Sequence, residues 1–432
     1  MFTRSASRLP WFAPAERVSA TAAVSGLLPG AIGFYFSFRV AIVLLTVRLF
    51  LQDAQTGVAA GLVCNYLLLV VVGFVSLGPP VCRVRSMVRG PVWWVLAFLG
   101  FSGISLLWSS TASLAAAAAF WCAMGADVAI LVLLLRNGSA DETGQALMRG
   151  FIWGTCAFAA IAWLLPAQSD LRLGDEELLG PNQIGYSCAF ACFLAQYLMS
   201  RRGRLWGFPA AFLAITLLRS LSKTTIVAFI AAEAFILLRD RSMTRTRKLV
   251  LLGLALVILF AFQGLIASYY TIYTNAGSQA ETLTGRLGIW AYFVTEAAQK
   301  PWIGHGFHSV WKVVPPFGPF EARHAHNELL QQFYAYGAAG IILVAGLYTS
   351  VFLQIRRLPR GPVKTFFHGL LIFVLVRGLA DTEPFDLSLP LWFVCLIAPV
   401  LMQWAAQPHE RPWALATTTP MPLVPLAEEP LL

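Results

Sequence analysis

Charged residues are scarce in this sequence. Only 12% of its 432 residues are Asp, Glu, Lys or Arg, whereas 58% are apolar. A typical soluble domain has about 25% charged residues, and a disordered chain has few apolar ones. The composition therefore excludes both classes and favours a protein whose surface faces lipid.

Cysteine and acidic residues are also few. The seven cysteines lie in or beside apolar runs without the spacing of metal ligands, so they predict packing roles and no disulfide framework. The 31 basic residues exceed the 21 acidic ones, and the formal net charge is +10. Because the basic residues gather at the ends of apolar segments, this excess indicates membrane topology and no nucleic-acid binding.

Long apolar runs make up most of the chain. A membrane-spanning helix needs about 20 mostly apolar residues. The sequence therefore predicts an all-α polytopic membrane protein with about twelve transmembrane helices. The expected spans are residues 31–50, 57–77, 92–110, 112–135, 150–167, 182–200, 205–221, 222–238, 249–267, 327–354, 365–380 and 387–405.

Basic residues near the span ends predict the orientation, because Lys and Arg stay on the cytoplasmic side. With the N-terminus inside, one large loop falls outside the cytoplasm. The resulting organisation is a cytoplasmic basic arm (1–30), helices one to nine (31–267), the large extracytoplasmic loop (268–325), helices ten to twelve (326–405) and a Pro-rich cytoplasmic tail (406–432).

Polar side chains that could bind an anion gather in the large loop and just after it. Apolar residues at helical spacing predict a helix over 282–300, with Arg286 in its first turn. A cation at that position opposes the helix dipole, which indicates a bound anion. The same stretch contains Arg323 and four of the six histidines: His305, His308, His324 and His326.

The apolar run that begins at His326-Asn327-Glu328 is longer than a bilayer core, so its first turns should project outside. At such a helix N-terminus the dipole favours a neutral imidazole, as a general base requires. Asn327 either caps the helix or binds substrate. The four loop histidines could instead form a zinc site, but their irregular spacing argues against it, and no metal or other cofactor is expected.

Three weaker candidates lie in other outer segments. Asn182 follows Pro181 where an outer loop re-enters the membrane. Arg219 and Lys223 lie on the short turn between the seventh and eighth spans, where the positive-inside trend disfavours cations, and they either bind an anion or snorkel. Asp127 and Glu233 lie within predicted spans. Each either has a functional role or forms an ion pair with an arginine of a neighbouring span.

A series of short motifs, densest over about 180–340, resembles the O-antigen ligase and polymerase family of bacterial envelope glycan assembly. The motifs are Pro181-Asn182, Ser222-Lys223-Thr224, Thr284-Gly285-Arg286 with Trp290, Pro301 with Gly304 and Gly306, and His324-Ala325-His326-Asn327 with Gly337. The resemblance implies a GT-C-like glycosyltransferase in the bacterial inner membrane, with its active site on the periplasmic side.

The resemblance also implies the chemistry. It suggests metal-independent, inverting transfer from an undecaprenyl-diphosphate-linked oligosaccharide, without a cofactor. His326 would be the catalytic base. Diphosphate contacts would come from Arg286, Lys223, Arg323 and Arg219, and weaker substrate or acceptor contacts from His324, Asn327, Asn182, His305 and His308. Family members often have Arg where this chain has Lys223, which lacks the bidentate fork.

The quoted residues do not separate a polymerase from an O-antigen ligase that transfers glycan to lipid A-core. General likeness to exopolysaccharide polymerases of the xanthan type favours polymerisation of repeat units. From another class, a lipid-linked glycan flippase or permease would also suit many spans, although no half-to-half repeat is evident. A scaffold is the third option, with the tail as a docking segment. The expected partners are the carrier-linked oligosaccharide, membrane lipids and other polysaccharide assembly and export proteins.

Overall fold

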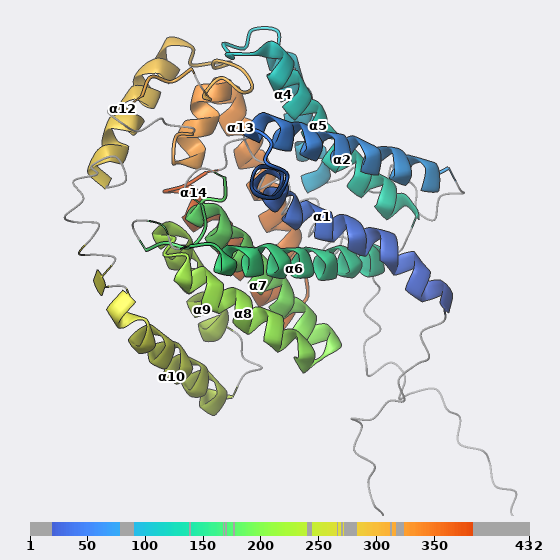
Figure 1. Ribbon diagram of the computed structural model, residues 1–432, viewed down its shortest axis with the longest axis vertical. Helices are drawn as coiled ribbons and strands as arrows, with labels where there is room; N and C mark the ends of the chain where they lie inside the picture. The colour runs from blue at the N-terminus through green and yellow to red at the C-terminus, as the bar shows by residue number, and fades with distance from the viewer. Residues whose placement is uncertain are drawn as a thin grey trace, which may run out of the picture.

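In the computed structural model, helices joined by loops make up the part of the chain that it describes (Figure 1). That part comprises residues 20–77, 90–137, 140–166, 168, 171–175, 178–239, 244–265, 267–268, 271, 283–311, 313–316 and 324–382. Within these ranges no strand forms, and an isolated bridge joins Asp175 to Leu179. The all-α prediction is confirmed for this part of the chain.

A helix overlaps each expected span up to 365–380, although α4, α8 and α10 are shorter than the expected spans, and the predicted loop helix over 282–300 is also present. The span expected at 387–405 and the tail lie outside the described residues. In chain order the helices are α1 (Ala20–Phe50), α2 (Ala54–Val75), α4 (Pro91–Ser105), α5 (Leu114–Asn137), α6 (Ala140–Leu164), α7 (Pro181–Arg202), the 3-10 turn η1 (Arg204–Trp206), α8 (Gly207–Arg219), α9 (Lys223–Arg239), α10 (Arg245–Ala261), α12 (Leu283–Gln299), α13 (Glu328–Arg357) and α14 (Pro362–Gly378).

Several helices are long and apolar enough to cross a bilayer. Among the described residues four helices meet that test, α2, α5, α6 and α13, with a fifth if the bent α1 counts as one span. The two parts of α1 meet at 68° beside Arg39. Apolar side chains on α2 and α10 are largely exposed, as lipid-facing helices require; Phe74 and Phe260 are each 70% exposed. The chain is thus a multi-pass membrane protein, while the count of about twelve spans stays a prediction.

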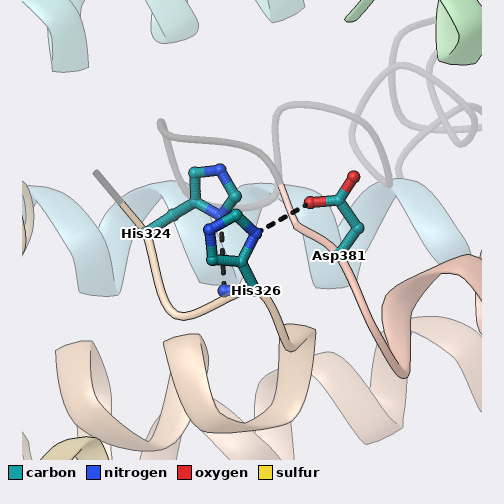
Figure 2. Close-up of side chains that lie close together, drawn as sticks. All are labelled: His324, His326 and Asp381. Atoms are coloured by element: carbon teal, nitrogen blue, oxygen red, sulfur yellow. Dashed lines mark hydrogen bonds and ion pairs between the residues drawn. The ribbon is translucent and has the colours of Figure 1, made fainter. Parts of the chain in front are cut away.

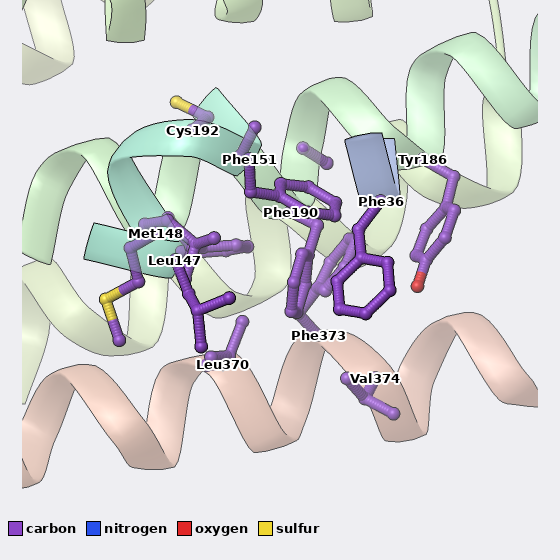
Figure 3. Close-up of a cluster of buried hydrophobic side chains, with 14 of the residues drawn as sticks. Phe36, Leu147, Met148, Phe151, Tyr186, Phe190, Cys192, Leu370, Phe373 and Val374 are labelled. Carbon is purple, nitrogen blue, oxygen red and sulfur yellow. The ribbon is translucent and has the colours of Figure 1, made fainter. Parts of the chain in front are cut away.

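Close helix packing forms the centre of the bundle. α1 lies along α6, and a Cβ added at Gly150 would come within 1.8 Å of the Gly30 carbonyl oxygen, so a larger residue would separate the two helices. Beside this contact, aromatic and aliphatic side chains of α1, α6, α7 and α14 form one buried cluster (Figure 3). Phe190 and Phe373 are among its fully buried members.

Polar pairs cross-link the helices within this scaffold. Arg39 on α1 donates to Asp127 on α5 at 2.7 Å, and Gln196 on α7 donates to Glu233 on α9 at 2.5 Å. The first pair confirms that Asp127 has an arginine partner on a neighbouring span. Each of the two acidic side chains thus has a hydrogen-bond partner on another helix, which gives it a structural role in the scaffold.

A smaller cluster of buried side chains joins α12 to α13. Ile289, Phe293 and Ala297 on one face of α12 pack with Tyr334 on α13. Phe293 and Ala297 belong to the apolar face expected from the sequence, whereas Leu287 and Val294, also expected on that face, are exposed. This packing places the start of α12 beside the start of α13, where four of the predicted site residues lie: Arg286, His324, His326 and Asn327.

Candidate functional site

The turn before α13 sets the position of His326. Asn327 is the N-cap of α13: its side-chain oxygen accepts from the Leu330 N–H at 3.0 Å. The Asn327 amide nitrogen also donates to the Leu379 carbonyl at 2.8 Å, which ties this turn to the end of α14. His326 itself has a φ of 51°, a left-handed conformation that is uncommon outside glycine and often found at functional sites. The expected position at a helix N-terminus is confirmed.

Asp381 lies beside His326, just after α14 (Figure 2). The His326 Nδ1 and Asp381 Oδ1 atoms are 3.6 Å apart. The Thr382 N–H donates to the same carboxylate oxygen at 3.0 Å, while Arg377 Nη2 lies 3.2 Å from the other oxygen. The side chain of Asp381 is only 3% exposed. An imidazole and a carboxylate from segments 55 residues apart in the chain thus form a pair.

The charge of Asp381 is set by opposing effects. Burial tends to raise its pKa, but the Arg377 guanidinium and the neighbouring imidazoles outweigh that effect and hold the pKa below its ordinary value. Arg377 is itself buried, with its guanidinium carbon 4.0 Å from the centre of the Tyr186 ring. The carboxylate therefore stays ionised at neutral pH.

His324 packs against His326, with ring centres 4.0 Å apart. The His326 backbone N–H donates to His324 Nδ1 at 3.3 Å (Figure 2). Burial, and secondarily the neighbouring His326, lowers the pKa of His324 well below its ordinary value. His324 is therefore a neutral imidazole at physiological pH.

Arg286 joins the same region from α12. It lies in the first turn of that helix, as predicted, and its Nη1 donates to the Ala380 carbonyl at 2.8 Å. From the next turn, Trp290 Nε1 donates to the carbonyl of Ala325, the residue between the two histidines, at 3.0 Å. α12 thus places a guanidinium next to the segment that carries Asp381.

The turn between α8 and α9 contributes a polar contact to α7. Ser222 Oγ donates to Asn182 Oδ1 at 3.1 Å and contacts Thr225 Oγ1 at 2.9 Å. Lys223 is the first residue of α9 and is exposed, whereas Arg219 donates to the Leu171 carbonyl at 2.6 Å. This contact indicates that Arg219 stabilises the loop between α6 and α7, to which Leu171 belongs.

His305 and His308 have partners in a different part of the fold. His305 Nε2 contacts the Glu296 carbonyl at 3.1 Å, and its ring stacks on Tyr334. His308 Nδ1 contacts Thr111 Oγ1 at 3.0 Å, and burial lowers the pKa of His308. A zinc site built from all four loop histidines is therefore wrong for the described residues. Arg323 lies outside them.

A different set of side chains has the geometry to bind a metal. Ligand atoms of His324, His326 and Asp381 all lie within 4.8 Å of one another. The sequence interpretation missed Asp381. An available signal was the spacing of Arg377 and Asp381, an arginine and a carboxylate four residues apart at the end of an apolar run.

The glycine motifs have a structural explanation in a break of α13. Gly337 has φ 60° and ψ −153° inside that helix. The preceding loop fills the break: the Ala338 N–H donates to the Pro301 carbonyl at 2.7 Å, and the Gly306 N–H donates to the Ala335 carbonyl at 2.7 Å. A Cβ added at Gly304 would lie 2.4 Å from the Tyr336 nitrogen, so this close approach requires glycine.

Comparison with known proteins agrees with these features. Residues 208–345 match the model of the O-antigen ligase family. The chain is 28% identical over 340 residues to an O-antigen ligase of Pseudomonas aeruginosa, covering 74% of this chain and 78% of that protein. It is 24% identical over 331 residues to the exopolysaccharide production protein ExoQ of Rhizobium meliloti, covering 67% and 72%.

The matched family segment contains Lys223, Arg286, His326 and Asn327 but ends before Asp381, which only the fold brings to the site. Together with the apolar helices, these similarities indicate a multi-pass membrane enzyme, similar to glycosyltransferases, whose residues 208–345 match the O-antigen ligase family model.

Proposed function

We propose that the protein polymerises oligosaccharide repeat units carried on undecaprenyl diphosphate into an exopolysaccharide, at the periplasmic face of the inner membrane. The observation that carries this proposal is the pairing of His326 with ionised Asp381, next to the Arg286 guanidinium. A base and a phosphate-binding cation are what transfer from a diphosphate-linked sugar to a hydroxyl requires.

In the proposed reaction, His326 is the general base. In the tautomer with its proton on Nδ1, facing Asp381, His326 carries a lone pair on Nε2, which would take the proton of the acceptor hydroxyl. The 3.6 Å separation suits a site without substrate, because catalytic hydrogen bonds commonly shorten when substrate binds. Asp381 stabilises the imidazolium that forms.

The leaving group is the carrier diphosphate. The acceptor oxygen attacks the anomeric carbon from the face opposite the diphosphate, the bond from that carbon to the phosphate oxygen breaks, and the diphosphate leaves with the electron pair. The configuration is inverted. Arg286 would stabilise the negative charge: a guanidinium has five N–H donors, and the contact with Ala380 uses one of them. Lys223 at the start of α9 would add a second cation.

A purified-protein assay tests the mechanism. Wild-type protein given lipid-linked repeat units in excess EDTA should produce a ladder of glycans on a gel. His326→Ala should reduce polymer formation by ~10²–10⁴-fold, the usual cost of removing a general base. Arg286→Lys should also be severely impaired, because a point charge cannot replace a bidentate contact with phosphate.

The matched control is His368→Ala, which removes a histidine of α14 whose Nδ1 contacts the Lys364 carbonyl at 2.8 Å. This variant should keep the ladder. Persistence of the ladder in His326→Ala, or its loss in EDTA, would overturn the mechanism.

A second candidate function is ligation of glycan to lipid A-core, which the similarity to an O-antigen ligase favours. A deletion strain separates the two: single repeat units on the carrier lipid indicate lost polymerisation, whereas long unattached chains indicate lost ligation. A flippase or permease, the alternative from another class, would move intact carrier lipid across liposome membranes and form no ladder.

A further inference from the structure

We propose that His324, His326 and Asp381 form a binding site for a divalent transition-metal ion of the zinc type, and that the bound ion inhibits the transferase. The binding follows from the geometry alone. The inhibition rests on the proposed function, because it assumes that His326 is the general base.

The separation between His326 and Asp381 carries the proposal. At 3.6 Å, Nδ1 and Oδ1 are too far apart for a good hydrogen bond. Two ligands that each lie about 2.0 Å from one tetrahedral zinc ion are about 3.3 Å apart. The pair is therefore spaced almost as two ligands of one ion, and Figure 2 shows both atoms directed toward each other.

The third ligand lies on the same turn. All the ligand atoms are within 4.8 Å of one another, so a rotation of the His324 ring brings it to the same ion. Its Nδ1 accepts a hydrogen bond of 3.3 Å from the His326 N–H, which is long for this type of bond and so restrains the ring only weakly. The segment is short and capped by Asn327, which keeps the two imidazoles close.

The donor set selects the kind of ion. Two imidazoles and one carboxylate suit zinc and its transition-metal neighbours, whereas magnesium and calcium prefer oxygen ligands. Three protein ligands leave a fourth position for water. Arg377, which contacts the remaining oxygen of Asp381, orients the carboxylate as outer partners do in metal sites.

Occupancy of this site is incompatible with base catalysis. A neutral imidazole has one N–H and one lone pair. When the lone pair of His326 is on Nδ1 and binds the metal, the proton is on Nε2, and Nε2 can only donate. The acceptor hydroxyl then has no base to take its proton.

The binding test uses Zn²⁺ and protein purified without a histidine tag. Calorimetry should detect one high-affinity ion per chain. His324→Ala and Asp381→Asn should each raise the Kd more than about tenfold, since even changes to outer partners of a metal site cost about that much. His368→Ala is the matched control and should bind as wild type does. The site would be overturned if the wild-type protein showed no high-affinity binding. It would also be overturned if His324→Ala and Asp381→Asn bound Zn²⁺ with the affinity of the wild type.

The activity test separates the two proposals. Metal-free wild-type protein should form polymer, Zn²⁺ should suppress it over the concentrations at which the site fills, and EDTA should restore it. Full activity with zinc bound would overturn the inhibition alone. Activity that requires zinc would overturn both the inhibition and the metal-independent mechanism, while inactivity in every condition would overturn the proposed function and leave the binding result intact.

Discussion

Arg377 is a buried guanidinium between an aromatic ring and a carboxylate. It lies 4.0 Å from the centre of Tyr186 and 3.2 Å from Asp381, and its side chain is 4% exposed. Tyr186 follows Asn182 by one turn of α7, so this contact connects the polar residues around Ser222 to the pair formed by His326 and Asp381. Arg377 therefore acts on the imidazole through Asp381, as a positioning residue.

We predict that Arg377→Gln moves the acid limb of the pH–activity profile to higher pH. Burial raises the pKa of Asp381 and Arg377 is the main effect that lowers it, so without Arg377 the carboxylate takes up a proton at a higher pH. In the wild-type protein the ionised carboxylate of Asp381 stabilises the folded state. This stabilisation is fully present above the pKa of Asp381 in the unfolded chain, and it is lost as the pH falls through the lower pKa of the folded protein. The measurement is the initial rate of polymer formation across pH.

Two variants control this experiment. Arg377→Lys keeps the charge and should shift the limb less, and Tyr186→Phe keeps the ring beneath the cation and should leave the limb in place. A profile of unchanged shape in Arg377→Gln would show that Arg377 has only a structural role.

The residues of the site were predictable to different degrees. His326, Asn327 and Arg286 lie in or next to motifs within one stretch of sequence, and their positions at helix ends follow from periodicity and capping. Asp381 was not predictable as a partner, because nothing local specifies which helix end packs beside His326. That contact depends on how α13 and α14 pack, which is a property of the whole bundle.

At the scale of elements, the break in α13 connects the loop 301–306 to the helix that begins at the histidine turn. Gly337 adopts a conformation that side chains disfavour, and a Cβ there would lie 2.5 Å from the Trp302 carbonyl carbon. The sequence showed the glycines and the proline but could not show that they meet, since 30 or more residues separate Gly304 from Gly337 and both are small residues in apolar surroundings.

Gly337→Ala should destabilise the protein and reduce activity. The strained backbone conformation alone costs roughly 1–3 kcal/mol, and the contact with residue 302 forces a further shift. Thermal unfolding in detergent measures the effect. Gly253→Ala on α10 is the control: nothing lies within 4 Å of its added Cβ, so it should be neutral or slightly stabilising. Equal unfolding temperatures for the two variants would contradict this account of the break.

At the scale of the whole molecule, the residues of the site lie at helix ends. The distribution of Lys and Arg along the sequence predicts that these ends are on the same side of the membrane. They occur at the starts of α7, α9, α12 and α13 and just after α14. Basic residues such as Arg239, Arg357 and Lys364 lie at or near the opposite ends. Hydrophobic length and charge alone predicted this arrangement, because the bilayer restricts helices to alternating directions. The order in which the helices pack was not predictable, since lipid-facing and protein-facing apolar surfaces have similar composition.

The orientation itself can be tested with two exposed positions. In a version without the seven native cysteines, Ala298→Cys on α12 should react with a membrane-impermeant maleimide in spheroplasts, because the large loop is predicted to be periplasmic. Thr246→Cys at the start of α10 is the matched position and should react only after the membrane is permeabilised. The reverse pattern would place His326 and Asp381 on the cytoplasmic side, where a periplasmic polymerase could not meet its substrate, and would therefore overturn the proposed function together with the topology.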